Sequence, residues 1–268
     1  MRPRGECLPA GRGVCAAVLS LAAALALSCC GSPDRPASEP AAPHVRHTPT
    51  AAGPWTFAVS GDHPVPPNGS QDTHAATPGA VCDHADFSKA MSTGRQVADG
   101  FTLAGFPAAA ALLRHFLDGK GTAAGYRAGS AVSKQALASS AFQAVDNQVQ
   151  GEILRQLKTG QARVRLSAAQ LPLVAFGSVG SDLYWGFRGT QGLTVTGTGT
   201  RRSGRYAGTL RYVIRDSYGF PAGESLAGFG PPMRYLQTVC GAPQHAAGAH
   251  WFPDAITVTV PFSHPVSG

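Results

Sequence analysis

The stretch LTVTGTGTRRSGRYAGTLRYVIR, residues 193–215, decides the fold of this chain. On both sides of its centre, small or apolar residues alternate with threonine or arginine, which is the period of a β-strand with one buried face. The centre, Arg202-Ser203-Gly204-Arg205, has the composition of a hairpin turn. The stretch therefore predicts two paired strands, one of which carries a ladder of threonines on its exposed side.

Two further runs, residues 183–187 and 256–262, alternate in the same way, so the sequence predicts an antiparallel sheet. Residues 82–160 instead show helical periodicity. Pro107 opens one apolar helix, and residues 133–158 predict a longer one. The predicted fold class is therefore α+β, with N-terminal helices followed by an antiparallel β-sheet.

The composition excludes several other classes of protein. Of the 268 residues, 33 are glycine and 21 are proline, and this combined share is well above the usual value of roughly 12%. An apolar fraction of 43% excludes a wholly disordered chain. The chain also lacks the Gly-X-Y period of collagen and the dense charged repeat of a coiled coil. A globular domain joined to low-complexity sequence remains.

The N-terminus has the pattern of an export signal. Three arginines precede residues 13–28, a run of 16 uncharged residues that is too short to span a bilayer comfortably and ends at Ser28-Cys29-Cys30. This pattern resembles the signal of a bacterial, actinobacterial-type secreted lipoprotein. The resemblance implies lipidation at Cys29, where Ser28 takes the preceding position, with Cys30 as the alternative acceptor. The other interpretation is an ordinary signal peptide.

These features predict three segments: a signal over 1–28, a Pro/Ala-rich tether over 29–80 and one globular domain over 81–268. Residues 31–80 contain 10 of the 21 prolines, which is typical of a linker. Within the tether, the aromatic pentamer 55–59 is expected to dock on the domain as an edge strand. Because no later run has 18 uncharged apolar residues, we expect a protein anchored to the cell membrane by lipid, outside the cytoplasm.

Cysteine use after processing predicts one disulfide. Only Cys82 and Cys240 lie in the globular part, and two thiols in an oxidising compartment most simply pair. The alternative is a single reactive cysteine. The net charge of +7 becomes about +5 once the signal is removed, which favours an anionic membrane or wall polymer as a partner. Nucleic acid is not an expected partner for an exported protein.

Five arginines around the hairpin form the candidate binding set, because guanidinium groups grip phosphate and carboxylate well. The alternative is that they only solvate the strands. They are Arg201, Arg202, Arg205, Arg211 and Arg215.

The segment Arg215-Asp216-Ser217-Tyr218-Gly219-Phe220 carries the candidate catalytic pair. It resembles the motif of colicin M-type bacteriocins, which cleave a lipid-linked cell-wall precursor. Asp216 and Tyr218 match the first parts of that motif. Because they are two residues apart, they project to the same side of a continuing strand, where we expect an exposed pair of base and hydrogen-bond donor. Gly219 stands where that family has a second aspartate, and residues 221–232 contain no histidine. The alternative is a turn capped by Asp216.

Neither a metal nor a cofactor is predicted. The set Cys240, His245, His250 and Asp254 matches none of the common zinc spacings. His115 and Asp118 share one helix face and are either an acid–base pair or a helix-end contact. The chain contains no P-loop, no G-x-S-x-G and no H-E-x-x-H.

The sequence thus favours a membrane-anchored extracytoplasmic lipoprotein whose domain binds an envelope polymer or partner without catalysis. One alternative is an envelope hydrolase that acts on lipid-linked cell-wall precursors through Asp216. The other is a structural or immunity-like lipoprotein that binds a protein.

Overall fold

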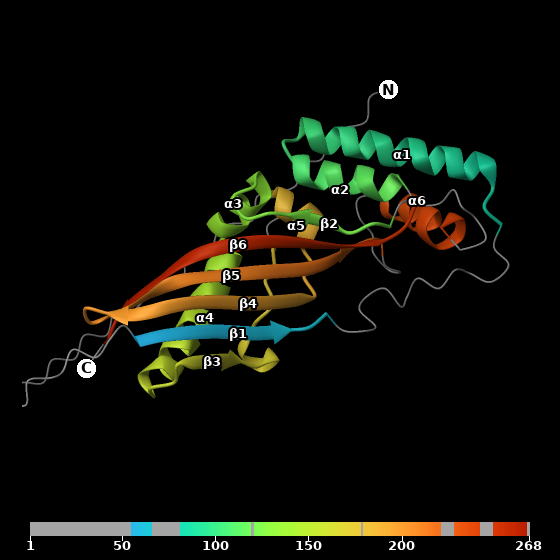
Figure 1. The fold of residues 1–268 in the computed structure, drawn as a ribbon. Helices are drawn as coiled ribbons and strands as arrows, with labels where there is room; N and C mark the ends of the chain where they lie inside the picture. The colour runs from blue at the N-terminus through green and yellow to red at the C-terminus, as the bar shows by residue number, and fades with distance from the viewer. Residues whose placement is uncertain are drawn as a thin grey trace, which may run out of the picture. The chain divides into compact units, whose positions relative to one another are not determined.

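The structure is a computed structural model that describes residues 55–65, 81–118, 121–177, 179–220, 228–241 and 249–266. The signal segment, Cys29, Cys30 and His245 lie outside these residues. One six-stranded sheet organises the described chain, in the order β2-β6-β5-β4-β1-β3 (Figure 1). The strands are β1 (Trp55–His63), β2 (Ala124–Tyr126), β3 (Arg163–Leu166), β4 (Gly192–Arg202), β5 (Arg205–Tyr218) and β6 (Phe252–Pro265).

The α+β class is confirmed, but the sheet is mixed rather than purely antiparallel. The four central strands pair antiparallel, whereas β1–β3 and β2–β6 are parallel pairs. Each parallel pair joins two strands that are far apart in the chain and have helices between them, as a parallel pair requires a long crossover connection rather than a tight turn. The chain also does not run from helices to strands, because β1 precedes every described helix.

Helices cover one side of the sheet. Figure 1 shows α4 behind the strands, with α1 and α2 side by side next to α6. The helices are α1 (His84–Leu103), α2 (Pro107–Leu117), α3 (Ala131–Ala138), α4 (Ser140–Lys158), α5 (Asp182–Phe187) and α6 (Gly230–Tyr235). As predicted, α2 begins with Pro107. A π-helical turn, η3 (Leu236–Cys240), follows α6.

The single long helix expected over 133–158 is two helices. The backbone of Ser139 is extended, so this residue ends α3 and caps α4, and its hydroxyl accepts the N–H of Phe142 at 3.2 Å. The break turns Leu137 away from the apolar stripe of α4, and Leu137 is 38% exposed.

The prediction of a strand over 183–187 is wrong, because these residues form α5. Ser181 caps the helix by accepting the N–H of Tyr184 at 3.2 Å. The Asp182 carboxylate accepts the N–H groups of Ala108 and Ala109 at 2.9 and 2.7 Å, which caps the start of α2 and joins the two helices. Leu183 and Phe187, four residues apart, are both buried as a helical face requires.

Residues 55–59 belong to the sheet, but not as an edge strand. Strand β1 pairs with β4 along its whole length and with β3 on its other side. Phe57 and Val59 are buried against the helix layer. The domain therefore includes residues 55–63, which the segment boundaries drawn from the sequence assigned to the tether.

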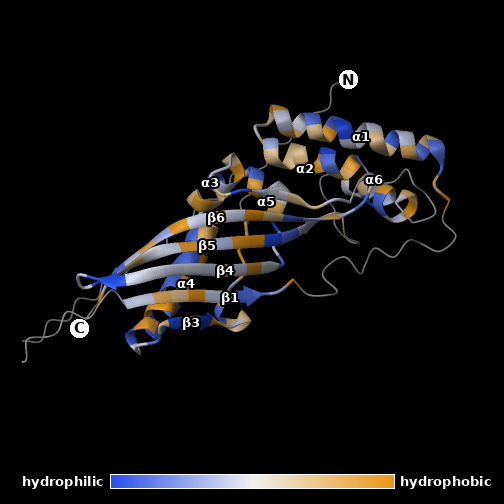
Figure 2. Cartoon of the chain, in the orientation of Figure 1, coloured by the Kyte–Doolittle hydropathy of each residue, from blue (hydrophilic) through white to orange (hydrophobic). Residues whose placement is uncertain are grey.

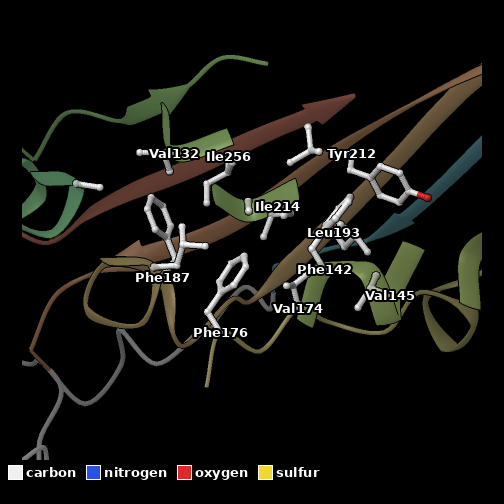
Figure 3. Close-up of a cluster of buried hydrophobic side chains, with 14 of the residues drawn as sticks. Val132, Phe142, Val145, Val174, Phe176, Phe187, Leu193, Tyr212, Ile214 and Ile256 are labelled. Atoms are coloured by element: carbon white, nitrogen blue, oxygen red, sulfur yellow. The ribbon is translucent and has the colours of Figure 1, made fainter. Parts of the chain in front are cut away.

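The hydrophobic core fills the space between the sheet and the helices. Apolar residues recur along the strands and along α4 (Figure 2). In β5 the even-numbered residues from Leu210 to Tyr218 are buried, and β6 repeats the pattern from Phe252 to Phe262. Figure 3 shows the central cluster, in which Phe142 of α4 meets Tyr212 of β5 edge-on at 5.2 Å between ring centroids.

The hairpin between β4 and β5 is confirmed as predicted. Ser203 and Gly204 occupy its two central positions with φ values of 49° and 72°, the left-handed conformation that a tight two-residue turn needs. The final strand returns to this turn, because the N–H of Val266 donates to the Gly204 carbonyl oxygen at 2.8 Å.

The glycines that alternate with threonine in β4 lie on its buried side. A Cβ at Gly199 would lie 2.3 Å from Cζ of Phe57 and 2.5 Å from the carbonyl oxygen of Ala207. We expect Gly199→Ala to lower the free energy of unfolding by about 1–3 kcal/mol, because the Phe57 ring must move. Urea denaturation measures the change. Gly151→Ala is the matched control, since that glycine lies within α4 with open space around it.

Gly151→Ala should raise stability by about 0.5–1 kcal/mol through helix propensity alone. Equal stability of Gly199→Ala and the unchanged protein would contradict the close packing of Phe57 on β4.

Candidate binding site on the open sheet face

The side of the sheet that faces away from α4 carries the candidate site, and we call it the open face. None of the described helices crosses it in Figure 1. Its side chains come from the even-numbered residues of β1 and β4 and from the odd-numbered residues of β3, β5 and β6. The ladder expected from sequence is here: Thr194, Thr196, Thr198 and Thr200.

Hydroxyl groups continue across the neighbouring strands in register. Thr56 and Ser60 of β1 lie opposite Thr200 and Thr196, while Thr209 of β5 lies opposite Thr198. Residues on one side of a strand repeat about every 6.7 Å, and neighbouring strands are about 4.8 Å apart. The open face is therefore a flat lattice of short hydroxyl side chains.

One row of this lattice carries two arginines with two hydroxyl side chains between them. Register across four pairs of strands gives the row Arg165, Ser60, Thr196, Arg211 and Thr259. Arg165 and Arg211 are three strands apart, which is about 14 Å between their backbones. Neither guanidinium has a side-chain partner within the described residues.

The five arginines of the candidate binding set do not all share this face. Arg202, Arg205, Arg211 and Arg215 lie on it by register. Arg201 points to the other side, where its guanidinium lies 5.9 Å from the centroid of the Tyr206 ring.

Two members of the set are already engaged. Arg215 forms an ion pair with Asp62 at 2.6 Å and also donates to the carbonyl oxygen of His63 at 3.1 Å. Arg205 donates to the Ser263 hydroxyl at 3.1 Å. Of the predicted set, Arg211 and Arg202 remain without a described side-chain partner, and Arg211 is the one at the centre of the face.

Sequence reasoning missed Arg163 and Arg165. Both project from β3 onto the open face, opposite Ala58 and Ser60, and both are exposed. The signal was the alternation in RVRL, residues 163–166. Four residues are too few to assign a strand with confidence, because a short alternating run also fits a loop or a helix end.

Positive charge dominates the open face. The Asp62 carboxylate is the only acidic group on it among the described strand residues. The Thr194 hydroxyl donates to Asp62 at 2.6 Å, and this hydrogen bond, followed by Arg215, lowers the pKa of Asp62. Asp62 is thus ionised and paired with Arg215. The other arginines of the open face therefore have no carboxylate among the described strand residues of this face to neutralise them.

A hollow of about 490 Å³ lies on this face where β1, β4 and the start of β3 meet. Thr56, Thr198 and Thr200 line it together with Arg163. The hollow therefore combines hydroxyl donors with one guanidinium, and it adjoins the row that contains Arg165 and Arg211.

Asp216 and Tyr218 are not an exposed pair. They share one side of β5, as expected, but that side faces the helix layer, and they are only 7% and 8% exposed. Tyr218 stacks on Phe252 with 5.4 Å between ring centroids. Burial, followed by the charge of Asp254, raises the pKa of Tyr218. Sequence reasoning also did not foresee that Asp254 lies directly opposite Asp216.

The remaining candidates, two cysteines and His115, make contacts that hold parts of the fold together. The disulfide between Cys82 and Cys240 is confirmed, with 4.9 Å between the Cα atoms. Nε2 of His115 lies 2.7 Å from the carbonyl oxygen of Thr122, and its ring meets Phe252 edge-on. Within the described ranges no group of three His, Cys, Asp or Glu side chains is arranged to hold a metal ion.

The chain matches no protein-family profile, no curated protein and no solved structure. None of the helices that the structure describes has the length and apolar character needed to cross a bilayer.

Proposed function

We propose that this protein binds an anionic polymer of the cell envelope on its open face and acts without catalysis. The row from Arg165 to Arg211 carries the proposal, because it places two guanidinium groups without described partners at the ends of a flat line of hydroxyls. A rigid sheet fixes this spacing in advance, so binding costs little ordering of the protein.

The chemistry of the face favours phosphate or carboxylate groups over neutral sugars. Guanidinium groups pair with such anions through two parallel hydrogen bonds, and threonine hydroxyls add further donors. Neutral sugars are usually held by stacking on aromatic rings, and the described strands present no aromatic side chain on this face.

The proposal includes the lipid anchor at Cys29 and a location outside the cytoplasm. Trp55, the first described residue, pairs with Arg201 beside the hairpin, and Val266 at the other end bonds to Gly204 of the same turn. The preceding tether would thus join the domain at the hairpin end of the sheet. Arg202 and Arg205 lie at that end, where cationic side chains suit an anionic membrane surface.

Binding should collapse when the row is reversed in charge. We expect Arg165→Glu combined with Arg211→Glu to weaken binding to polyphosphate and to isolated wall polymer by at least a hundredfold. Each lost charge-assisted hydrogen bond is worth about 1.5–3 kcal/mol, and each glutamate adds repulsion. Co-sedimentation at several salt concentrations measures the affinity, and the variant should also lose much of its salt dependence.

The matched control is Lys89→Glu combined with Arg95→Glu, two exposed positions on α1 with the same change in net charge. This control should bind nearly as well as the unchanged protein. Equal loss in both variants would mean that only net charge matters, and no loss in the row variant would overturn the proposal. Capture that disappears after protease treatment of the envelope extract would instead favour a protein partner.

A further inference from the structure

Two buried carboxyl groups face each other in the sheet on the side away from the open face. Asp216 of β5 and Asp254 of β6 are register partners, 7% and 3% exposed, and both point toward the helix layer. Side chains directly opposite in an antiparallel pair have Cβ atoms about 4.5–5.5 Å apart. Such proximity makes double ionisation of the pair unfavourable in a dry environment.

The two carboxyl groups differ in their hydrogen bonds. Asp216 accepts the N–H of Ser217 at 2.8 Å and a second backbone N–H from Gly189. Both carboxyl oxygens of Asp254 are buried and have no hydrogen-bond partner among the described residues. The backbone N–H of Asp254 itself is the one group that lowers its pKa, and burial and the charge of Asp216 outweigh it. A carboxylate in that position is therefore poorly compensated, whereas a protonated carboxyl is far less costly there.

The other polar groups around the pair do not neutralise it. The charge of Asp254 contributes to raising the pKa values of Tyr218 on β5 and Tyr126 on β2. The charge of Asp182 on α5 also contributes to raising the pKa of Tyr126. The cation that acts on the pair is Arg188, which follows α5, and its effect on Asp216 is smaller than that of burial and of both backbone hydrogen bonds. Arg188 also bonds to the Tyr184 hydroxyl at 3.3 Å.

We propose that Asp216 and Asp254 form a proton-holding pair that makes the β5–β6 end of the sheet a pH-sensitive element, closed when protonated and opened as the pair ionises. The pair lies two residues from the end of β5 and two residues after β6 begins. Local opening there is sufficient to expose both carboxyl groups to water. This device is separate from the proposed binding function, which uses the opposite face.

The sign of the pH effect follows from proton binding. Burial raises the pKa of Asp216 to about 7, and burial together with Asp216 raises the pKa of Asp254 well above its ordinary value. The folded state therefore holds protons that the unfolded state has released. Stability contributed by the pair is complete below the ordinary carboxyl pKa and is lost as pH rises toward the folded-state pKa.

The first experiment is urea unfolding of the unchanged protein from pH 5 to pH 8. Asp62 and Glu152, whose pKa values are lowered, stay ionised across this window and add no slope. We expect the ratio of unfolded to folded protein to rise up to tenfold per pH unit for each retained proton, the reverse of ordinary acid denaturation. Amide hydrogen exchange at residues 214–218 and 252–256 should accelerate beyond its intrinsic pH dependence.

Asp254→Asn removes one of the two retained protons and should reduce the slope of this pH profile to that of Asp216 alone, whereas Asp86→Asn, an exposed residue in the first turn of α1, should leave it unchanged. If Asp254→Asn fails to fold, infrared spectroscopy of the unchanged protein tests whether the pair is protonated. The band of the protonated carboxyl group should then disappear as the pH rises. A profile without slope between pH 5 and pH 8 would overturn the proposal. A slope abolished by millimolar Ca²⁺ or Mg²⁺ would also overturn it, because the pair would then be a cation site.

Discussion

Replacing Phe142 with alanine is expected to lower the free energy of unfolding by about 3–5 kcal/mol. Phe142 is fully buried in the first turn of α4 and meets the Tyr212 ring edge-on at 5.2 Å. The Tyr212 hydroxyl donates to Asp146 of the same helix at 2.6 Å, so at this point the aromatic packing of β5 on α4 is reinforced by a hydrogen bond. Loss of the ring leaves a cavity beneath the hydrogen bond and removes aromatic packing.

Urea denaturation measures this loss, and Gln148→Ala on the exposed side of α4 is the control, with an expected change within about 0.5 kcal/mol. A loss below about 1 kcal/mol for Phe142→Ala would contradict the packing of α4 on β5. Since domains of this size are stable by about 5–15 kcal/mol, the expected loss is a large share of the total.

The second large effect is expected from the disulfide. Changing both Cys82 and Cys240 to serine should destabilise the protein by about 3–5 kcal/mol, because the bridge closes a loop with a sequence separation of 158 residues. The bridge ties Cys82, two residues before α1, to the end of η3, and the Tyr235 hydroxyl supports it by accepting the N–H of Asp83 at 2.9 Å. Urea unfolding of the double variant and of the oxidised protein gives the difference directly.

Reduction of the unchanged protein with dithiothreitol is the control, and it should reproduce the stability of the double variant. Identical stability of the oxidised protein and the double-serine variant would show that this end of the domain is already ordered without the covalent link.

The sequence predicted those parts of the fold whose signals are local. Pro107, the hairpin at Ser203-Gly204 and the alternating runs in β4, β5 and β6 each act within a few residues, and all three were confirmed. The disulfide was also predictable, because only two cysteines remain in the globular part. The α5 segment has a misleading local pattern, since Leu183, Trp185 and Phe187 alternate like the residues of a strand. Its helical signal was the cap Ser181, which a short apolar run easily obscures.

The features that sequence reasoning missed depend on long-range pairing. Nothing near Arg165 indicates that Ser60 and Thr196 will align with it, because register across β3, β1 and β4 is set by three distant segments. The opposition of Asp216 and Asp254 has the same origin. Asp254 was grouped with Cys240 and the histidines by proximity in sequence, whereas the sheet places it against a residue of the preceding strand.

The position of β1 between β3 and β4 has a consequence for how the chain acquires its structure. Although β1 is the first described element, the strand partners of Ala58 are Arg163 and Thr198, which are synthesised more than 100 residues later. A growing or emerging chain thus has no native sheet to join until most of the domain is available, and such distant pairings form slowly. The chain should therefore remain loosely structured until these segments have been synthesised. Trp55, which packs near Tyr206 once β1 has docked, offers a fluorescence signal for the moment when β1 joins the sheet.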